Sequence, residues 1–127
     1  MKDYKKYFTI TAKPQEVYLA LTREPTIELW TGDRAKMQAE EGTEFSLWDD
    51  SIVGVNLEFE TNKKIVQKWY FGDQEEDSIV TIKLHPHKLG TSVELIHTNI
   101  PDGDYDDIVG GWNEDYFGSL RDFYTGE

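Results

Sequence analysis

The stretch Ile52-Val53-Gly54-Val55-Asn56-Leu57-Glu58-Phe59 decides the fold class of this 127-residue chain. Its apolar residues recur at every second position, with glycine, asparagine and glutamate between them. A period of two is typical of a β-strand that buries one face. The pattern predicts an antiparallel sheet with one covered, apolar face, which would carry Val53, Val55, Leu57 and Phe59.

Five more segments around this stretch have strand-like composition, rich in β-branched and aromatic residues. They span residues 34–39, 43–48, 64–71, 78–84 and 91–97. Turn-rich segments separate the six strands, at residues 41–42, 49–51, 61–63, 72–77 and 85–90. Six strands in series predict an antiparallel meander.

The residues before and after the meander predict what covers the sheet. We expect a strand over residues 7–12, a helix opened by Pro14, and a second short helix over residues 26–30 that ends at Thr31-Gly32. Apolar residues at helical spacing predict one long helix between Tyr105 and Tyr124: Ile108, Val109, Trp112, Tyr116, Leu120 and Phe123. Its glycines, Gly110, Gly111 and Gly118, indicate either close approach to the sheet or a break in the helix.

Composition excludes several classes of protein. The 25 acidic residues outnumber the 13 basic ones, and a net charge of −12 argues against a nucleic-acid partner, which needs a basic face. No apolar run approaches the ~20 residues of a membrane span, so we expect no membrane insertion and a cytoplasmic location. Without cysteine there is no disulfide or thiolate metal site. We expect one domain over residues 1–127.

The order of the elements and several sequence blocks resemble a known family. A strand, two helices, a meander and a long terminal helix form the α+β helix-grip fold of START and birch-pollen-allergen-like proteins. The blocks at residues 14–22, 42–47, 54–56, 65–69, 90–95, 97–101 and 111–112 are similar to those of the activator of the 90-kDa heat-shock protein ATPase. Two residues depart from that family: Asp50 stands where a glycine is usual and Tyr70 where an arginine is common.

The resemblance implies a fold and a partner. The fold would be a curved antiparallel sheet of about seven strands wrapped on the terminal helix, with two short helices after the first strand. The eukaryotic activator carries this kind of domain as its C-terminal half, and a separate N-terminal domain makes much of the contact with the chaperone. The implied partner is a 90-kDa heat-shock chaperone or another protein.

Aromatic residues and one histidine are the candidate ligand-binding residues. The rings of Trp30, Trp48, Trp69, Trp112 and Tyr116 are expected either to line an apolar cavity under the terminal helix or to fill that space. His97 shares a strand face with Val93 and Leu95, so it should be buried, either as a hydrogen-bonded core residue or as a polar anchor for a ligand. The candidate ligand-binding set is Trp48, Trp69, His97, Trp112 and Tyr116.

Two sequence patterns contain residues that can bind metal ions, but each lacks ligands that a metal site requires. His85-Pro86-His87 has no evident third ligand and is expected in an exposed turn. Asp102, Asp104 and Asp106 have the spacing of a calcium loop, but its sixth and twelfth places hold Asp107 and Asn113 in place of glycine and glutamate. They are expected before and in the first turn of the terminal helix, where they cap it and favour the positive end of its dipole. We therefore expect no metal and no cofactor.

Three functions remain open. The first is a non-enzymatic, co-chaperone-like regulator that binds its partner through an acidic surface. Residues 41–127 would supply this surface, because they include 19 acidic and only 6 basic residues. The second is a carrier or sensor of a small hydrophobic ligand held between sheet and terminal helix. Enzymatic turnover, as in aromatase and cyclase relatives of the fold, rests on fold analogy alone, and no catalytic residue is expected.

Overall fold

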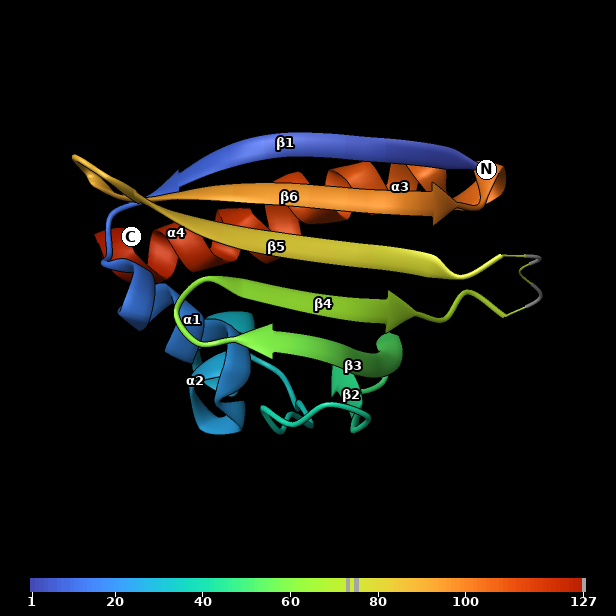
Figure 1. The fold of residues 1–127 in the computed structure, drawn as a ribbon, viewed down its shortest axis with the longest axis horizontal. Coiled ribbons are helices and arrows are strands. Elements are labelled where there is room, and N and C mark those ends of the chain that lie inside the picture. Colours follow the sequence, from blue (N-terminus) through green and yellow to red (C-terminus); the bar gives the residue numbers. More distant parts are fainter. Residues whose placement is uncertain (73, 75, 127) are drawn as a thin grey trace.

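A computed structural model of the chain describes residues 1–72, 74 and 76–126, and it has helices packed on one face of an antiparallel sheet (Figure 1). The sheet has six strands within the described residues, in the order β1-β6-β5-β4-β3-β2. The strands are β1 (Lys2–Ile10), β2 (Glu44–Leu47), β3 (Ile52–Glu60), β4 (Lys64–Trp69), β5 (Ser78–His87) and β6 (Gly90–Ile100). The last five strands form a meander, and β1 pairs with β6 at its edge.

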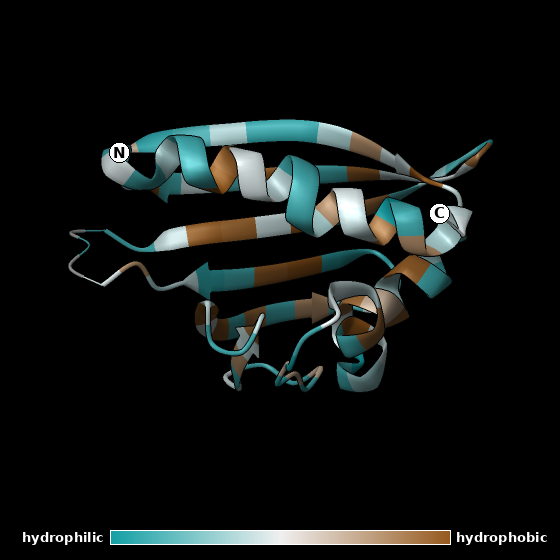
Figure 2. Ribbon diagram, turned by 180° about the vertical axis from the view of Figure 1, so that it is seen from behind, coloured by the Kyte–Doolittle hydropathy of each residue, from teal (hydrophilic) through white to brown (hydrophobic). Residues whose placement is uncertain are grey.

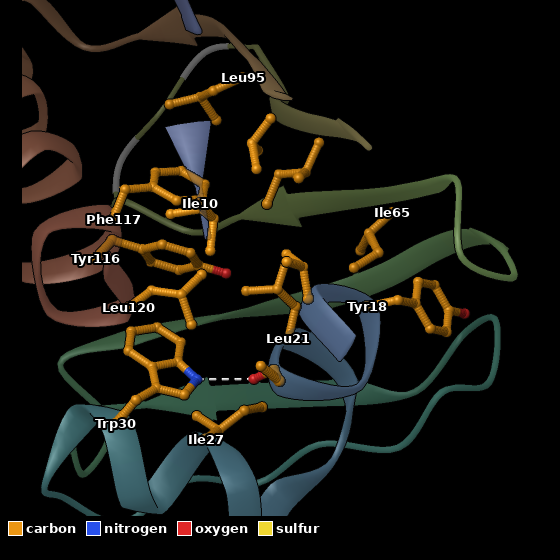
Figure 3. Close-up of a cluster of buried hydrophobic side chains, with 14 of the residues drawn as sticks. Ile10, Tyr18, Leu21, Ile27, Trp30, Ile65, Leu95, Tyr116, Phe117 and Leu120 are labelled. Carbon is orange, nitrogen blue, oxygen red and sulfur yellow. Dashed lines mark hydrogen bonds between the residues drawn. The ribbon is translucent and has the colours of Figure 1, made fainter. Parts of the chain in front are cut away.

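Two short helices follow β1 and pack at the end of the sheet. They are α1 (Pro14–Thr22), with its proline in the first turn, and α2 (Glu24–Thr31), which ends at Gly32 with a φ of 74°. A left-handed residue at this place favours glycine, as the sequence predicts. The indole Nε1 of Trp30 donates a 2.7 Å hydrogen bond to the carbonyl of Ala20, which joins the two helices inside the core (Figure 3).

The predicted terminal helix lies across the sheet, over its β1, β6 and β5 side (Figure 2). It comprises α3 (Tyr105–Gly110), a π-helical turn (Gly111–Tyr116) and α4 (Phe117–Thr125), after a 3-10 turn at Asp102–Asp104. Phe117 and Leu120 are fully buried, and the Phe117 ring stacks on that of Phe8 in β1 at 4.4 Å. This segment, residues 105–125, is called the terminal helix below.

The glycines of the terminal helix accompany the π-helical turn. A Cβ at Gly118 would lie 2.9 Å from the carbonyl oxygen of Asn113, five residues earlier, which explains why this position lacks a side chain. A Cβ at Gly110 would meet nothing within 4 Å, so close approach to the sheet is the wrong explanation for that residue. The irregularity is a widened turn within a continuous helical segment.

The predicted strand over residues 34–39 is wrong. Only one isolated bridge forms there, between Lys36 and Ser46. The neighbouring amides are taken by carboxylates of α2: Glu28 accepts from the N–H of Ala35 at 3.1 Å, and Glu24 from that of Met37 at 3.0 Å. Helix side chains therefore satisfy the backbone that a further strand would have paired. The sheet accordingly has six strands in the part of the chain that the structure describes, where about seven were expected.

The predicted inward face of β3 is also wrong. Gly54 and Asn56 are buried, whereas Val53 and Val55 are only half-buried and Leu57 is 39% exposed. A β-bulge between Asn56 and Glu58 then shifts the register, which leaves Phe59 half-buried against the core. The alternation identified a strand correctly, but Val53, Val55 and Leu57 lie on the face opposite the buried Gly54 and Asn56.

Gly54 is where a small substitution should have a clear effect. A Cβ there would lie 2.0 Å from the carbonyl oxygen of Lys68 and 2.8 Å from the Phe45 ring. We expect Gly54→Ala to lower the free energy of unfolding by about 1–3 kcal/mol, because β3 and β4 must separate. Urea denaturation measures this, with Val53→Ala on the outer face as the control. Equal stability of the two variants would contradict the packing described.

Other element bounds differ from the prediction by a few residues. β1 begins at Lys2 and ends at Ile10, where residues 7–12 were expected, and β5 extends through His87. The predicted turn at residues 72–77 includes residues 73 and 75, which lie outside the described residues. Among the described helices, none is long and apolar enough to span a membrane.

Candidate functional site

The five predicted ligand-binding residues come together in one aromatic cluster. Trp69 from β4 and Trp112 from the π-helical turn stack with centroids 4.7 Å apart and planes at 26°. Tyr116 lies 4.7 Å from Trp112, and Trp48, just after β2, lies 6.0 Å from Tyr116. The ring of His97 lies 5.2 Å from that of Trp69. Rings from the sheet, a turn and the terminal helix thus meet at one place.

A pocket of about 480 Å³ opens beside this cluster, between the terminal helix and the β2–β3 turn. Trp48, Trp69, Trp112 and Tyr116 line it, and His97 and Trp30 do not. Trp69, Trp112 and Tyr116 are at most 5% exposed, so they fill most of the space under the helix and present little surface to the pocket. Its full lining is Asp33, Trp48, Ser51, Ile52, Trp69, Asp107, Ile108, Gly111, Trp112, Asp115 and Tyr116.

His97 lies behind the pocket and links the terminal helix to the sheet. It is fully buried, as predicted. The indole Nε1 of Trp112 donates to its Nδ1 at 3.0 Å, and its Nε2 lies 2.8 Å from the hydroxyl of Ser78 on β5. That hydroxyl lies 3.1 Å from the carbonyl of Thr98. We call the side chains of Trp112, His97 and Ser78 the histidine bridge.

The donors of the histidine bridge fix its protonation state. An indole N–H only donates, so Nδ1 of His97 accepts and carries no proton. The proton of the neutral ring is then on Nε2 and is donated to Ser78, whose hydroxyl donates to Thr98. Burial lowers the pKa of His97 to about 4, against a smaller raising effect of the Asp3 charge. The ring is therefore neutral at pH 7.

A second chain of buried polar groups supports the other side of the cluster. The Trp69 indole donates to Gln67 at 3.1 Å, and the Gln67 amide donates to Asn56 at 3.0 Å. Asn56 in turn donates to the Gln38 carbonyl and the Thr43 hydroxyl, both at 3.2 Å. The amide pair explains why β3 turns Asn56 inward: buried polar groups require partners, and these find them on β4 and on the chain before β2.

Unusual backbone forms two walls of the pocket. Trp48, Asp49 and Asp50 are consecutive left-handed residues, with φ of 50°, 51° and 68°. Asp50 thus has a left-handed backbone, which glycine adopts at the least cost. On the opposite wall, Gly111, Trp112, Asp115 and Tyr116 belong to the π-helical turn. Such backbone costs stability and is frequent at functional sites.

Sequence analysis did not predict three carboxylates that line the pocket. Asp33 follows α2, and Asp107 and Asp115 belong to the terminal helix. All three residues are exposed. A signal for Asp115 was present, because residues 108, 112 and 115 lie on one side of a helix, so this aspartate shares the apolar stripe.

The two metal-like patterns do not assemble a site. The His85-Pro86-His87 segment is the exposed end of β5 and not a turn, and His85 lies 2.8 Å from Glu94 on β6. That hydrogen bond is the main cause that lowers the pKa of Glu94. Asp102 and Asp104 precede α3 and Asp106 lies in its first turn, as expected, but Asp104 makes no capping hydrogen bond through its side chain. The described residues contain no group of three or more potential metal ligands.

Comparison with known proteins agrees with this architecture. The family model "Activator of Hsp90 ATPase homolog 1-like protein" matches residues 11–124. A Dictyostelium discoideum activator of 90 kDa heat shock protein ATPase homolog is 28% identical over 88% of this chain and 30% of its own length. The human homolog 1 is 26% identical over 89% of this chain and 34% of its own length. The chain thus spans about a third of these relatives.

Solved structures share the fold over nearly the whole chain. The crystal structure of an HSP90 activator from Plasmodium falciparum has a TM-score of 0.85 and 26% identity, and the match covers 98% of this chain and 96% of that one. An Aha1 dimer from Colwellia psychrerythraea, at 18% identity and a TM-score of 0.81, shows the same fold over 98% of this chain and 96% of that one. With six antiparallel strands against a terminal helix, this chain belongs to the family of activator of Hsp90 ATPase homolog 1-like proteins, with the helix-grip fold.

Proposed function

We propose that this protein binds a 90-kDa heat-shock chaperone and raises its ATPase rate, without catalysing a reaction itself. The family match over residues 11–124 carries this proposal. The Plasmodium protein described as an HSP90 activator supports it further, because the match covers 96% of that chain.

The terminal helix and the turn before it are the surface that best suits a basic partner. Residues 101–125 hold seven carboxylates and one arginine, which is half of the net charge of −12. Asp106, Glu114 and Asp122 are exposed there. Charges at the edge of an interface steer a partner of opposite sign and are screened by salt. We infer that a basic surface of the chaperone docks against this helix.

Removing helix charge should weaken binding. The triple variant Asp106→Asn, Glu114→Gln, Asp122→Asn keeps side-chain size and removes three charges at positions outside the pocket lining. We expect about a tenfold loss of affinity for the source organism's own 90-kDa chaperone at low salt, with a smaller loss at moderate salt. Isothermal titration calorimetry at two salt concentrations measures both.

A matched variant separates local charge from total charge. Glu40→Gln, Glu41→Gln, Glu44→Gln removes the same number of charges from exposed residues before and at the start of β2. We expect this control to bind nearly as the unmodified protein does. Equal weakening in both triple variants would mean that only the net charge matters, and undiminished binding in the helix variant would contradict docking there.

A second candidate function is binding of a small molecule in the pocket. The observation that favours it is a lined volume of about 480 Å³ with four aromatic residues, within the usual ~300–1,000 Å³ of ligand sites. Titration with the neutral alcohol 3,3-dimethyl-1-butanol, followed by the indole N–H signals in nuclear magnetic resonance (NMR) spectra, tests it. Shifts at Trp48, Trp69 and Trp112 support the pocket, and unchanged signals oppose binding of a neutral ligand there.

A further inference from the structure

We propose that the pocket binds a small organic cation, an alkylammonium or guanidinium compound with an apolar body. This inference rests on the second candidate function and names its ligand class. The pocket combines two features that suit such a ligand. Its inner wall is made of aromatic rings, and three carboxylates belong to its lining.

The aromatic wall attracts positive charge. Trp48, Trp69, Trp112 and Tyr116 line the pocket, and Trp48 is the half-exposed one among them. The face of an indole ring carries negative charge, and a cation over the half-exposed Trp48 would gain about 0.5–2 kcal/mol, more as the site excludes water. Trp112 cannot offer a face, because it is stacked between the rings of Trp69 and Phe117. A neutral apolar compound of equal size would gain the burial but not this attraction.

The carboxylates add to the same preference. Asp33, Asp107 and Asp115 belong to the lining, which includes no lysine, arginine or histidine among the described residues. None of the three forms an ion pair with another described residue within 4.0 Å. Asp33 accepts one hydrogen bond, from the N–H of Arg34 at 2.8 Å, which leaves its other oxygen for a ligand. The pocket therefore has negative charge that the described part of the protein does not neutralise.

The spacing of these carboxylates selects an organic cation over a metal ion. They come from three places: the segment after α2, α3 and the π-helical turn. No group of three acidic or histidine side chains in the described ranges is close enough together to hold a metal ion. A bare divalent ion needs several oxygens at 2.0–2.6 Å. An alkylammonium ion is larger and weakly hydrated, so it can fill the pocket and interact with dispersed charges.

The test compares choline with its neutral isostere, 3,3-dimethyl-1-butanol, in which carbon replaces the charged nitrogen. NMR titrations on the full chain follow the indole N–H signals of Trp48, Trp69 and Trp112. We expect choline to bind about tenfold more tightly than the alcohol, because only choline gains the attraction of the rings and carboxylates. The same spectra show whether each variant remains folded.

Two variants assign the effect to the pocket. Asp115→Asn removes a lining charge and should weaken choline binding about three- to fivefold while leaving the alcohol unaffected. Asp122→Asn, on the same terminal helix but outside the lining, should change neither. Equal affinity for choline and the alcohol would overturn the cation inference but leave the small-molecule function standing. Binding of neither compound would overturn both.

Discussion

Trp112→Ala is expected to lower the free energy of unfolding by about 3–5 kcal/mol, the range for removing a large buried aromatic side chain. Trp112 is 2% exposed and contacts rings of Trp69, Tyr116 and Phe117. The substitution leaves a cavity and also removes the hydrogen-bond donor to His97. Urea denaturation followed by circular dichroism measures the loss. A decrease below 1 kcal/mol would contradict the role given to this residue.

One further variant tests the hydrogen bond separately, and another serves as a control. Trp112→Phe keeps most of the ring but removes the N–H, so the buried Nδ1 of His97 loses its donor, at a cost of about 1–3 kcal/mol. Leu29→Ala, on a side chain that is 71% exposed, should have almost no effect. If Trp112→Phe were as stable as the unmodified protein, the hydrogen bond in the histidine bridge would not contribute to stability.

Acid is expected to destabilise the protein through His97, by about 3 kcal/mol between pH 6.5 and pH 4. Burial lowers the pKa of this histidine in the folded state to about 4, from 6.5 in the unfolded chain. Between these values the unfolded state binds the extra proton and the folded state does not. The full stabilisation is therefore present above pH 6.5 and is lost as the pH falls toward 4.

The variant His97→Gln isolates this contribution. Its side-chain oxygen can accept from Trp112 and its amide can donate to Ser78, as neutral histidine does, but it does not titrate. Unfolding free energies of both proteins, measured from pH 7 to pH 4, should show a smaller acid-dependent decrease in the variant. Parallel curves would mean that groups other than His97 cause the loss.

Sequence reasoning grouped the aromatic residues that the structure brings together, but it misassigned residues 34–39 and the buried face of β3. Side-chain alternation correctly predicted that His97 is buried, because Val93 and Leu95 on the same strand face are apolar. The same rule failed for β3, because the buried side chain of Asn56 is satisfied by Gln67 from another strand. Such a pairing depends on register, which alternation within one segment does not contain.

The pocket needed the three-dimensional structure for similar reasons. Helical spacing predicted that Trp112 and Tyr116 share a helix face, but the widened π-helical turn that carries them has no simple sequence signal. Asp33 is more than seventy positions from Asp107 in sequence, and only the folded chain places both in one lining. Sequence analysis found the apolar part of the pocket and missed its charges.

The most direct test of the proposed function is the ATPase rate of the source organism's own 90-kDa heat-shock chaperone, measured with increasing amounts of this protein. We predict a saturable increase in the rate, strongest at low salt, because acidic residues on the terminal helix would contact a basic surface. An ATPase rate that stays constant at every protein concentration, at low as well as moderate salt, would contradict the account.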